Sequence, residues 1–166
     1  MIQLAIFLPL MGGILAGVFG NRMGDRASQL VTVLPMLLAA ILSAYLLREV
    51  GFQGNSQTIE LFTWIDSGTL ELSWALRFDT LTAVMVFVVN VVSSMVHVYS
   101  VGYMAHDPHK PRFMAYLSLF TFFMLALVSA DNFVQMFFGW EGVGLMSYLL
   151  IGFWYHRPAA NAAAIK

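Results

Sequence analysis

One acidic residue of this chain lies inside a long apolar stretch. Glu141 stands in the run Gly139-Trp140-Glu141-Gly142-Val143-Gly144, and no other charge interrupts residues 132–155. It follows Asp131 by ten residues, which in a helix is about 15 Å, or half of a ~30 Å hydrocarbon core. A charge at that depth costs roughly 2.5–3.5 kcal/mol, so the carboxyl group needs a partner, a water-lined cavity or a proton. The position predicts a proton-relay site. The alternative is a structural carboxyl group bonded to a neighbouring helix.

A histidine occupies a second apolar run. His97 lies within residues 80–105, and Asn90, Ser94 and His97 share a helix face by their spacing of three or four. The sequence therefore predicts a polar seam along that helix. Imidazole exchanges protons near neutral pH and would suit a relay. A lone membrane histidine also serves as a hydrogen-bonding group between helices, so both interpretations stay open.

The composition excludes several classes of protein. The 166 residues are 60% hydrophobic and 10% charged, with a net charge of −1, whereas soluble domains carry about 25% charge. A soluble enzyme and a nucleic-acid partner are disfavoured. The absence of cysteine excludes disulfides, cysteine-ligated iron–sulfur clusters and thiol catalysis. His106 and His109 have no third metal ligand beside them, so we expect no metal or cofactor to bind this chain.

Five apolar runs are each long enough to cross a bilayer, which takes about 20 residues. We expect an all-α polytopic membrane protein with helices at about 2–20, 28–47, 80–104, 113–130 and 132–155. Pro158 and the alanines after it predict the start of a sixth helix at 159–166. That helix is too short to stand alone. We therefore expect residues 1–166 to be the N-terminal part of a single membrane domain, as a fragment or one piece of a split protein.

The segment between the second and third helices has a different pattern. Apolar residues alternate from Leu70 to Phe78, which predicts a strand with one sheltered face. A poorer strand, Thr58–Ile65, precedes it, and Asp66-Ser67-Gly68 is a turn signal. We expect a short β-hairpin on the membrane surface, followed by Asp79 as the N-cap of the third helix.

The basic residues predict the orientation of the chain. Six Lys and Arg residues fall in the segments after helices one, three and five, and two fall in the long segment after helix two. Basic residues concentrate in inner loops. The sequence thus predicts a multi-pass protein with its N-terminus outside, its C-terminus inside and an extracytoplasmic hairpin.

The motifs resemble a known family. The run from Phe138 to Phe153 around Glu141 closely resembles the fifth-helix signature of the antiporter-like subunit of respiratory complex I, called subunit L in bacteria and chain 5 in mitochondria. Other stretches also look like that family: Phe78-Asp79-Thr80-Leu81-Thr82, Gly102-Tyr103-Met104, Arg112-Phe113, Tyr116-Leu117 and Ala160-Asn161-Ala162-Ala163-Ala164.

The resemblance implies a proton-translocating subunit of NADH:quinone oxidoreductase, in which the family's fifth-helix glutamate maps onto Glu141. In the family that carboxylate pairs with a lysine on a later helix. NADH, FMN, iron–sulfur clusters and quinone belong to other subunits, so this chain alone would carry out no redox chemistry. The implied partners are membrane lipid, other membrane-arm subunits and the remaining helices of its own subunit. The implied location is the bacterial cell (inner) membrane, or the mitochondrial inner membrane if the protein is organellar.

Two other functions stay open. The large subunit of a multi-subunit cation/proton antiporter is homologous and keeps the same acid. A purely structural membrane-arm fragment would use Glu141 only for packing.

Overall fold

The chain folds into a bundle of long helices with a hairpin at one end. The computed structural model describes residues 1–166. The long helices are α1 (Ile2–Met23), α2 (Asp25–Leu46), α3 (Thr80–Tyr103), α4 (Lys110–Val128) and α5 (Phe133–Ile151). The shorter elements are the π-helical turn η1 (Leu47–Phe52), the strands β1 (Gln57–Ser67) and β2 (Leu70–Phe78), and the helix α6 (Pro158–Ile165). Five helices are long and apolar enough to cross a membrane, with α2 and η1 counted as one. The expected fold is confirmed.

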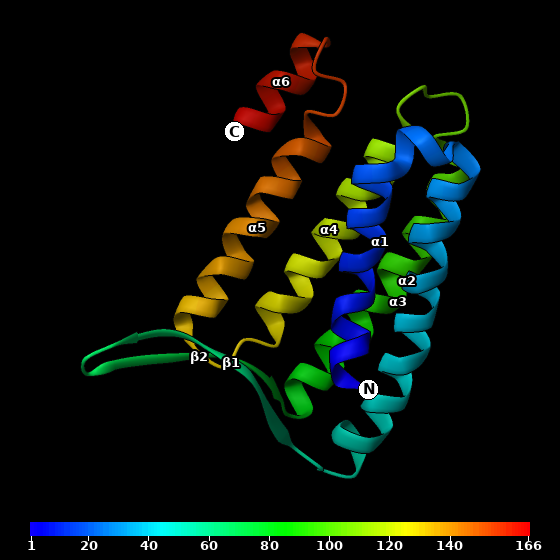
Figure 1. Ribbon diagram of the computed structural model, residues 1–166. Coiled ribbons are helices and arrows are strands. Elements are labelled where there is room, and N and C mark those ends of the chain that lie inside the picture. Colours follow the sequence, from blue (N-terminus) through cyan, green and yellow to red (C-terminus); the bar gives the residue numbers. More distant parts are fainter.

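The long helices differ in which neighbours they pack against. Helix α1 packs against α2 and α4, and α2 packs against α3. Helix α5 stands at the edge of the bundle and packs mainly against α4 and α6 (Figure 1). The hairpin, the N-terminus and the α4–α5 junction lie at one end, which we call the hairpin end. The α1–α2, α3–α4 and α5–α6 connections lie at the opposite end, which we call the loop end (Figure 1). One side of α5 is therefore open.

Several helix boundaries differ from the sequence prediction by two to four residues, and three of them have a clear local cause. Helix α2 begins at Asp25 because Gly24 adopts a φ of 82°, which lets the chain reverse within one residue. Pro111, predicted to lie in a loop, sits in the first turn of α4, where the missing N–H of proline costs no helical bond. Helix α5 ends at Ile151 instead of Tyr155, and the N–H of Gly152 closes its last turn on the Tyr148 carbonyl at 2.9 Å.

Glycines bring α1 close to its neighbours. A Cβ atom on Gly12 would lie 2.9 Å from the Val31 carbonyl oxygen, and one on Gly20 would lie 2.6 Å from the Pro111 Cβ. The same atom on Gly13 would lie 2.9 Å from the Leu119 side chain. Gly12, Gly13 and Gly20 thus let α1 pack closely against α2 and α4. Gly17 is roomier, with its nearest neighbour at 3.6 Å.

The hairpin is antiparallel, as predicted, but its turn and its burial differ in detail. Ser67 pairs with Leu70, so the turn is Gly68-Thr69, with a positive φ of 63° at Gly68. Burial along β2 is graded: Phe78 and Leu76 are buried at the bundle, whereas Leu70 at the tip is 52% exposed. Ala75, predicted to face away from the sheltered side, is buried because β2 also lies on the start of α5.

Asp79 caps α3, as predicted. Its carboxylate accepts the Thr82 N–H at 2.9 Å, and the Arg77 guanidinium lies 3.4 Å away. The backbone hydrogen bond from Thr82 is the main cause that lowers the pKa of Asp79 below its ordinary value of 3.8, and Arg77 adds to it.

We expect Asp79→Ala to lower the unfolding free energy by about 1 kcal/mol at pH 7, whereas Asp79→Asn, which still caps, costs less. The pKa of Asp79 is lower in the folded chain than in the unfolded chain. The ionised cap therefore contributes its full stabilisation above the unfolded-state pKa, and this stabilisation is lost as pH falls through the folded-state pKa. Thermal unfolding followed by circular dichroism at pH 7 and pH 3 measures this. If the difference in stability between wild type and Asp79→Ala is as large at pH 3 as at pH 7, the ionised cap is not its cause.

Candidate functional site

Glu141 lies in the middle of α5, as the ninth of its 19 residues. Its side chain is exposed on the open side of the helix. Trp140 and Gly144 are exposed there too. We call these three residues the open face of α5. The carboxyl group therefore forms no ion pair that would hold the present bundle together.

The glycines around Glu141 fall on two sides of the helix. Gly139 and Gly142 are buried against α4: a Cβ on Gly139 would lie 2.7 Å from the Leu127 backbone, and one on Gly142 would overlap the Phe123 ring. Gly144 has nothing within 4 Å of such an atom. Two of the three glycines therefore serve the α4–α5 contact, and only Gly144 continues the face of Glu141.

No basic side chain of this chain neutralises Glu141. The ion pairs of the chain are Arg77–Asp79, His109–Asp107 and Lys110–Asp25, all near helix ends. Glu141 is thus in none of the ion pairs of the chain.

His97 occupies a buried polar cluster between α3 and α4. The side chain is fully buried, with Nδ1 2.7 Å from the Ser93 carbonyl oxygen and Nε2 3.0 Å from the Ser118 hydroxyl. Since a carbonyl only accepts, Nδ1 donates there, and Nε2 of the neutral ring accepts from Ser118. The Ser93 hydroxyl also bonds to that of Thr121. Asn90 and Ser94 are buried on the same side of α3, so the predicted polar seam is confirmed.

The structure does not bring the two candidates together. Glu141 faces away from the bundle on α5, while His97 is enclosed where α3 meets α4. Two partners on α4 were missed: Ser118, which bonds to His97, and Thr121, which bonds to Ser93. Their spacing of three places both on one helix face and was the available signal.

A second group missed by sequence reasoning anchors the hairpin to α5. Gln135 is fully buried, and its Oε1 accepts the Ala75 N–H at 3.1 Å. Asn132 caps α5 by accepting the Gln135 N–H and donates to the Ser73 carbonyl at 2.8 Å. The Arg77 N–H donates to the Ser129 carbonyl at 2.9 Å. The hairpin is thus tied to the same helix that carries Glu141.

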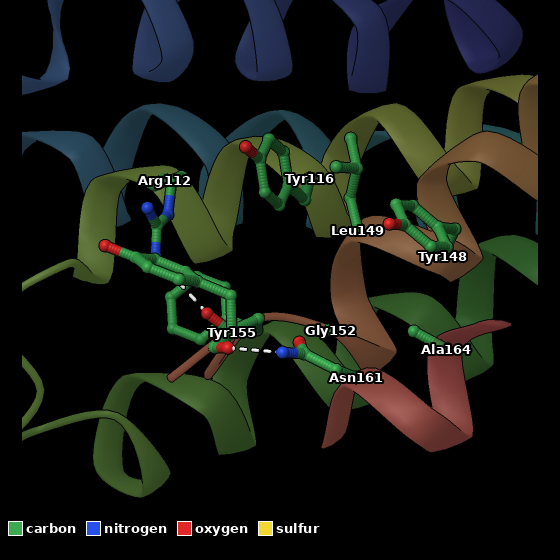
Figure 2. A pocket seen from close by; sticks show the side chains of 9 residues that line it. Arg112, Tyr116, Tyr148, Leu149, Gly152, Tyr155, Asn161 and Ala164 are labelled. Carbon is green, nitrogen blue, oxygen red and sulfur yellow. Dashed lines mark hydrogen bonds between the residues drawn. The ribbon is translucent and has the colours of Figure 1, made fainter. Parts of the chain in front are cut away.

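At the loop end, polar and aromatic side chains join α4 to the segment after α5. The Trp154 indole donates to Asp107 at 2.9 Å, and so does the His109 N–H at 2.8 Å. Burial by itself raises the pKa of Asp107, but these bonds and the nearby positive charges outweigh it and lower that pKa. Arg112 lies over the Phe153 ring at 4.7 Å, and Figure 2 shows it beside Tyr155 at a cavity of about 170 Å³.

The predicted loop histidines take no common partner. His106 is exposed, and the His109 ring lies 3.8 Å from Asp107. No group of three or more His, Asp or Glu side chains gathers anywhere in the chain.

Comparison with known proteins finds relatives along the whole chain. The family described as "NADH-Ubiquinone oxidoreductase (complex I), chain 5 N-terminus" matches residues 64–114. The family described as "NADH:quinone oxidoreductase/Mrp antiporter, TM" matches residues 130–166, which include Glu141. A likeness in fold alone comes from a chain of the membrane-bound sulfane sulfur reductase, an archaeal respiratory membrane complex. It aligns with a TM-score of 0.84 over 99% of this chain and 32% of its own length, at 17% identity.

Curated relatives share about half of their aligned residues with this chain. Proteins named NADH-ubiquinone oxidoreductase chain 5 are 52% identical over 161 residues in Dictyostelium discoideum, 51% over 166 in Chondrus crispus and 50% over 166 in Arabidopsis thaliana. The alignments cover 97%, 100% and 100% of this chain but 24%, 25% and 25% of those proteins. The chain thus spans about a quarter of the length of these relatives, and it belongs to the NADH-ubiquinone oxidoreductase chain 5 family.

Proposed function

We propose that this chain is the N-terminal part of the antiporter-like, proton-translocating membrane subunit of NADH:quinone oxidoreductase. The observation that carries the proposal is Glu141, a carboxyl group at the middle of a membrane-length helix with no basic partner in the chain. An acid inside a membrane span is by default a candidate functional residue, and proton relays are built from such residues. NADH, FMN, iron–sulfur clusters and quinone would act in other subunits, and this chain would contribute to the translocase without redox chemistry of its own.

Glu141 would act as a proton carrier whose charge is balanced by a basic group outside residues 1–166. A carboxyl group can take up a proton and pass it on, and a cation beside it would balance the charge that is left. The open face of α5 leaves room for such a group to approach, because Gly144 adds no side chain beside the carboxyl group. The remaining helices of the same subunit and other membrane-arm subunits are the proposed partners on this face.

The charges at the two ends support a definite orientation. The hairpin end carries Arg48 and Arg77 against six acids, a net −4 (2 − 6), if histidines are neutral; the acids are Glu49, Glu60, Asp66, Glu71, Asp79 and Asp131. The loop end and tail carry six basic residues against Asp25 and Asp107, a net +4 (6 − 2). With Glu141 the sum is −1, as in the whole chain. By the positive-inside rule the hairpin is proposed to be extracytoplasmic and the loop end to lie inside.

The membrane is proposed to be the bacterial cell membrane, or the mitochondrial inner membrane in an organelle. The function is tested in vesicles that contain the intact complex, where NADH oxidation should drive proton movement that depends on Glu141. One observation favours a second candidate, a multi-subunit cation/proton antiporter: the family matched at residues 130–166 also includes Mrp antiporters. Sodium-driven proton movement without NADH oxidation would decide for the antiporter.

His97 receives a more limited proposal. Both ring nitrogens are engaged within the α3–α4 contact, which favours helix packing over a relay. We expect His97→Gln to lower the unfolding free energy of the chain by about 1–3 kcal/mol, because buried groups lose their partners. The protons moved per NADH should stay unchanged in the complex that assembles. A lowered proton ratio in fully assembled complex would instead make His97 part of the proton path.

A further inference from the structure

A cavity at the loop end lies between α1 and α4. Its volume is about 380 Å³, within the ~300–1,000 Å³ typical of small-molecule sites. We call it the α1–α4 cavity. Small residues, among them Ala16, Gly17 and Ala115, form its apolar part, and its polar side chains are Asn21, His109, Arg112 and Tyr116. Arg112 also contacts Phe153 in the segment after α5, but none of these side chains belongs to the proposed proton path.

Arg112 is the one permanent cation of the cavity, and its guanidinium group is only partly satisfied. It forms none of the ion pairs of the chain. Its Nη2 donates to the Phe153 carbonyl at 3.4 Å, while its Nε is buried without any partner. The Phe153 and Tyr155 rings hold the planar group at 4.7 and 5.8 Å from their centres. An arginine fixed in this way offers donors in a fork that matches an oxyanion.

The nearby carboxylates do not fill that role. Asp107 is close enough for Arg112 to help lower its pKa, but Trp154 and the His109 N–H already donate to its oxygens. Asp25 is held by Lys110 at 2.7 Å. Neither carboxylate thus forms an ion pair with Arg112.

We propose that the α1–α4 cavity binds the phosphate of an anionic phospholipid, with Arg112 as its main ligand. Three observations point to lipid. Arg112 lies in the first turn of a membrane-length helix, which is headgroup depth. The loop end carries the net +4 that attracts anionic lipid. The small residues of the cavity, Ala16, Gly17 and Ala115, lie nearer the middle of α1 and α4 than Asn21 and Arg112 do, so its apolar part is on the side where acyl chains would lie.

The phosphate belongs in this cavity rather than in the smaller one of Figure 2, which Arg112 also lines. That smaller cavity extends along α5 to Tyr148 and Leu149, and the Asn161 amide there is committed to the Tyr155 carbonyl at 2.6 Å. In the α1–α4 cavity, Asn21 lies in the last turn of α1 and His109 directly precedes α4, so both stand at the loop end of the bundle.

The test measures lipid binding to the full chain in detergent by native mass spectrometry. Phosphatidylglycerol, phosphatidylcholine with the same acyl chains, and inorganic phosphate are titrated separately. We expect Arg112→Gln to weaken phosphatidylglycerol binding by about 10-fold or more and Arg112→Lys to weaken it less. Arg157→Gln is the matched control, since Arg157 lies over Trp154 at the same membrane end but does not line the cavity. It should change binding by less than about 2-fold.

A second pair of variants locates the site. Asn21→Ala should weaken phosphatidylglycerol binding, whereas Asn161→Ala, in the smaller cavity, should not. Equal losses in Arg112→Gln and Arg157→Gln would overturn the proposal in favour of general surface attraction. Equal binding of phosphatidylcholine, or equally tight inorganic phosphate, would overturn the assignment to an anionic lipid. Circular dichroism of Arg112→Lys, which keeps the charge, shows whether a loss of binding reflects a loss of fold.

Discussion

Replacing Glu141 by glutamine is expected to lower the proton translocation carried through this subunit on the order of 100-fold, because proton transfer by a positioned side chain contributes about 10²–10⁴-fold. Glutamine keeps the size of the side chain but cannot take up and release the proton. Glu141 is exposed and forms no ion pair in the chain, so assembly of the complex should survive. The measurement is protons moved per NADH oxidised, in vesicles that contain the complex.

The matched control for this variant is Asp131→Asn. Asp131 is an exposed acid at the α4–α5 junction, ten residues before Glu141. The Asp131→Asn variant should leave the number of protons moved per NADH unchanged. Glu141→Asp keeps a titratable group on a shorter stem and should retain part of the activity. Normal translocation with Glu141→Gln would remove Glu141 from the proton path. A complex that fails to assemble would make it a packing carboxyl group.

The second large effect is expected at Gly139, where α5 approaches α4 most closely through backbone. The added Cβ of Gly139→Ala would lie 2.7 Å from both the Leu127 Cα and its amide nitrogen, and backbone atoms cannot move aside as a side-chain tip can. We expect the variant to lower the unfolding free energy of the chain by about 1–3 kcal/mol, the usual cost of overpacking. Thermal unfolding in detergent, followed by circular dichroism, measures the change.

Gly144→Ala is its matched control, because the same atom would meet nothing within 4 Å. Here alanine should stabilise the isolated chain by up to about 1 kcal/mol through helix propensity. If the open face is a packing surface, the same variant should lower assembly of the complex that contains this chain. Equal destabilisation by both alanines would contradict the division of the glycines between two sides of α5.

Much of the fold follows from local features of the sequence. The apolar runs predict the five long helices because the bilayer sets a minimum span length, and Asp79 marks the start of α3 because its carboxyl group fits the first free N–H groups. Helix ends were less predictable. Gly24, Pro111 and Gly152 could each lie inside a helix end or just outside it. Which of these occurs depends on which backbone N–H and carbonyl groups find hydrogen-bond partners.

The residues of the candidate site, too, were only partly predictable from the sequence. The sequence by itself determined that Glu141 is the acid at the middle of a span, since depth depends only on distance along a helix. It also placed Asn90, Ser94 and His97 on one face. Only the tertiary structure decided that Gly139 and Gly142 face α4 while Glu141 and Gly144 face outward, that Ser118 is the partner of His97, and that Arg112 is left with a free donor. Periodicity tells which residues share a side of a helix. Which neighbour covers that side depends on how all the helices pack together.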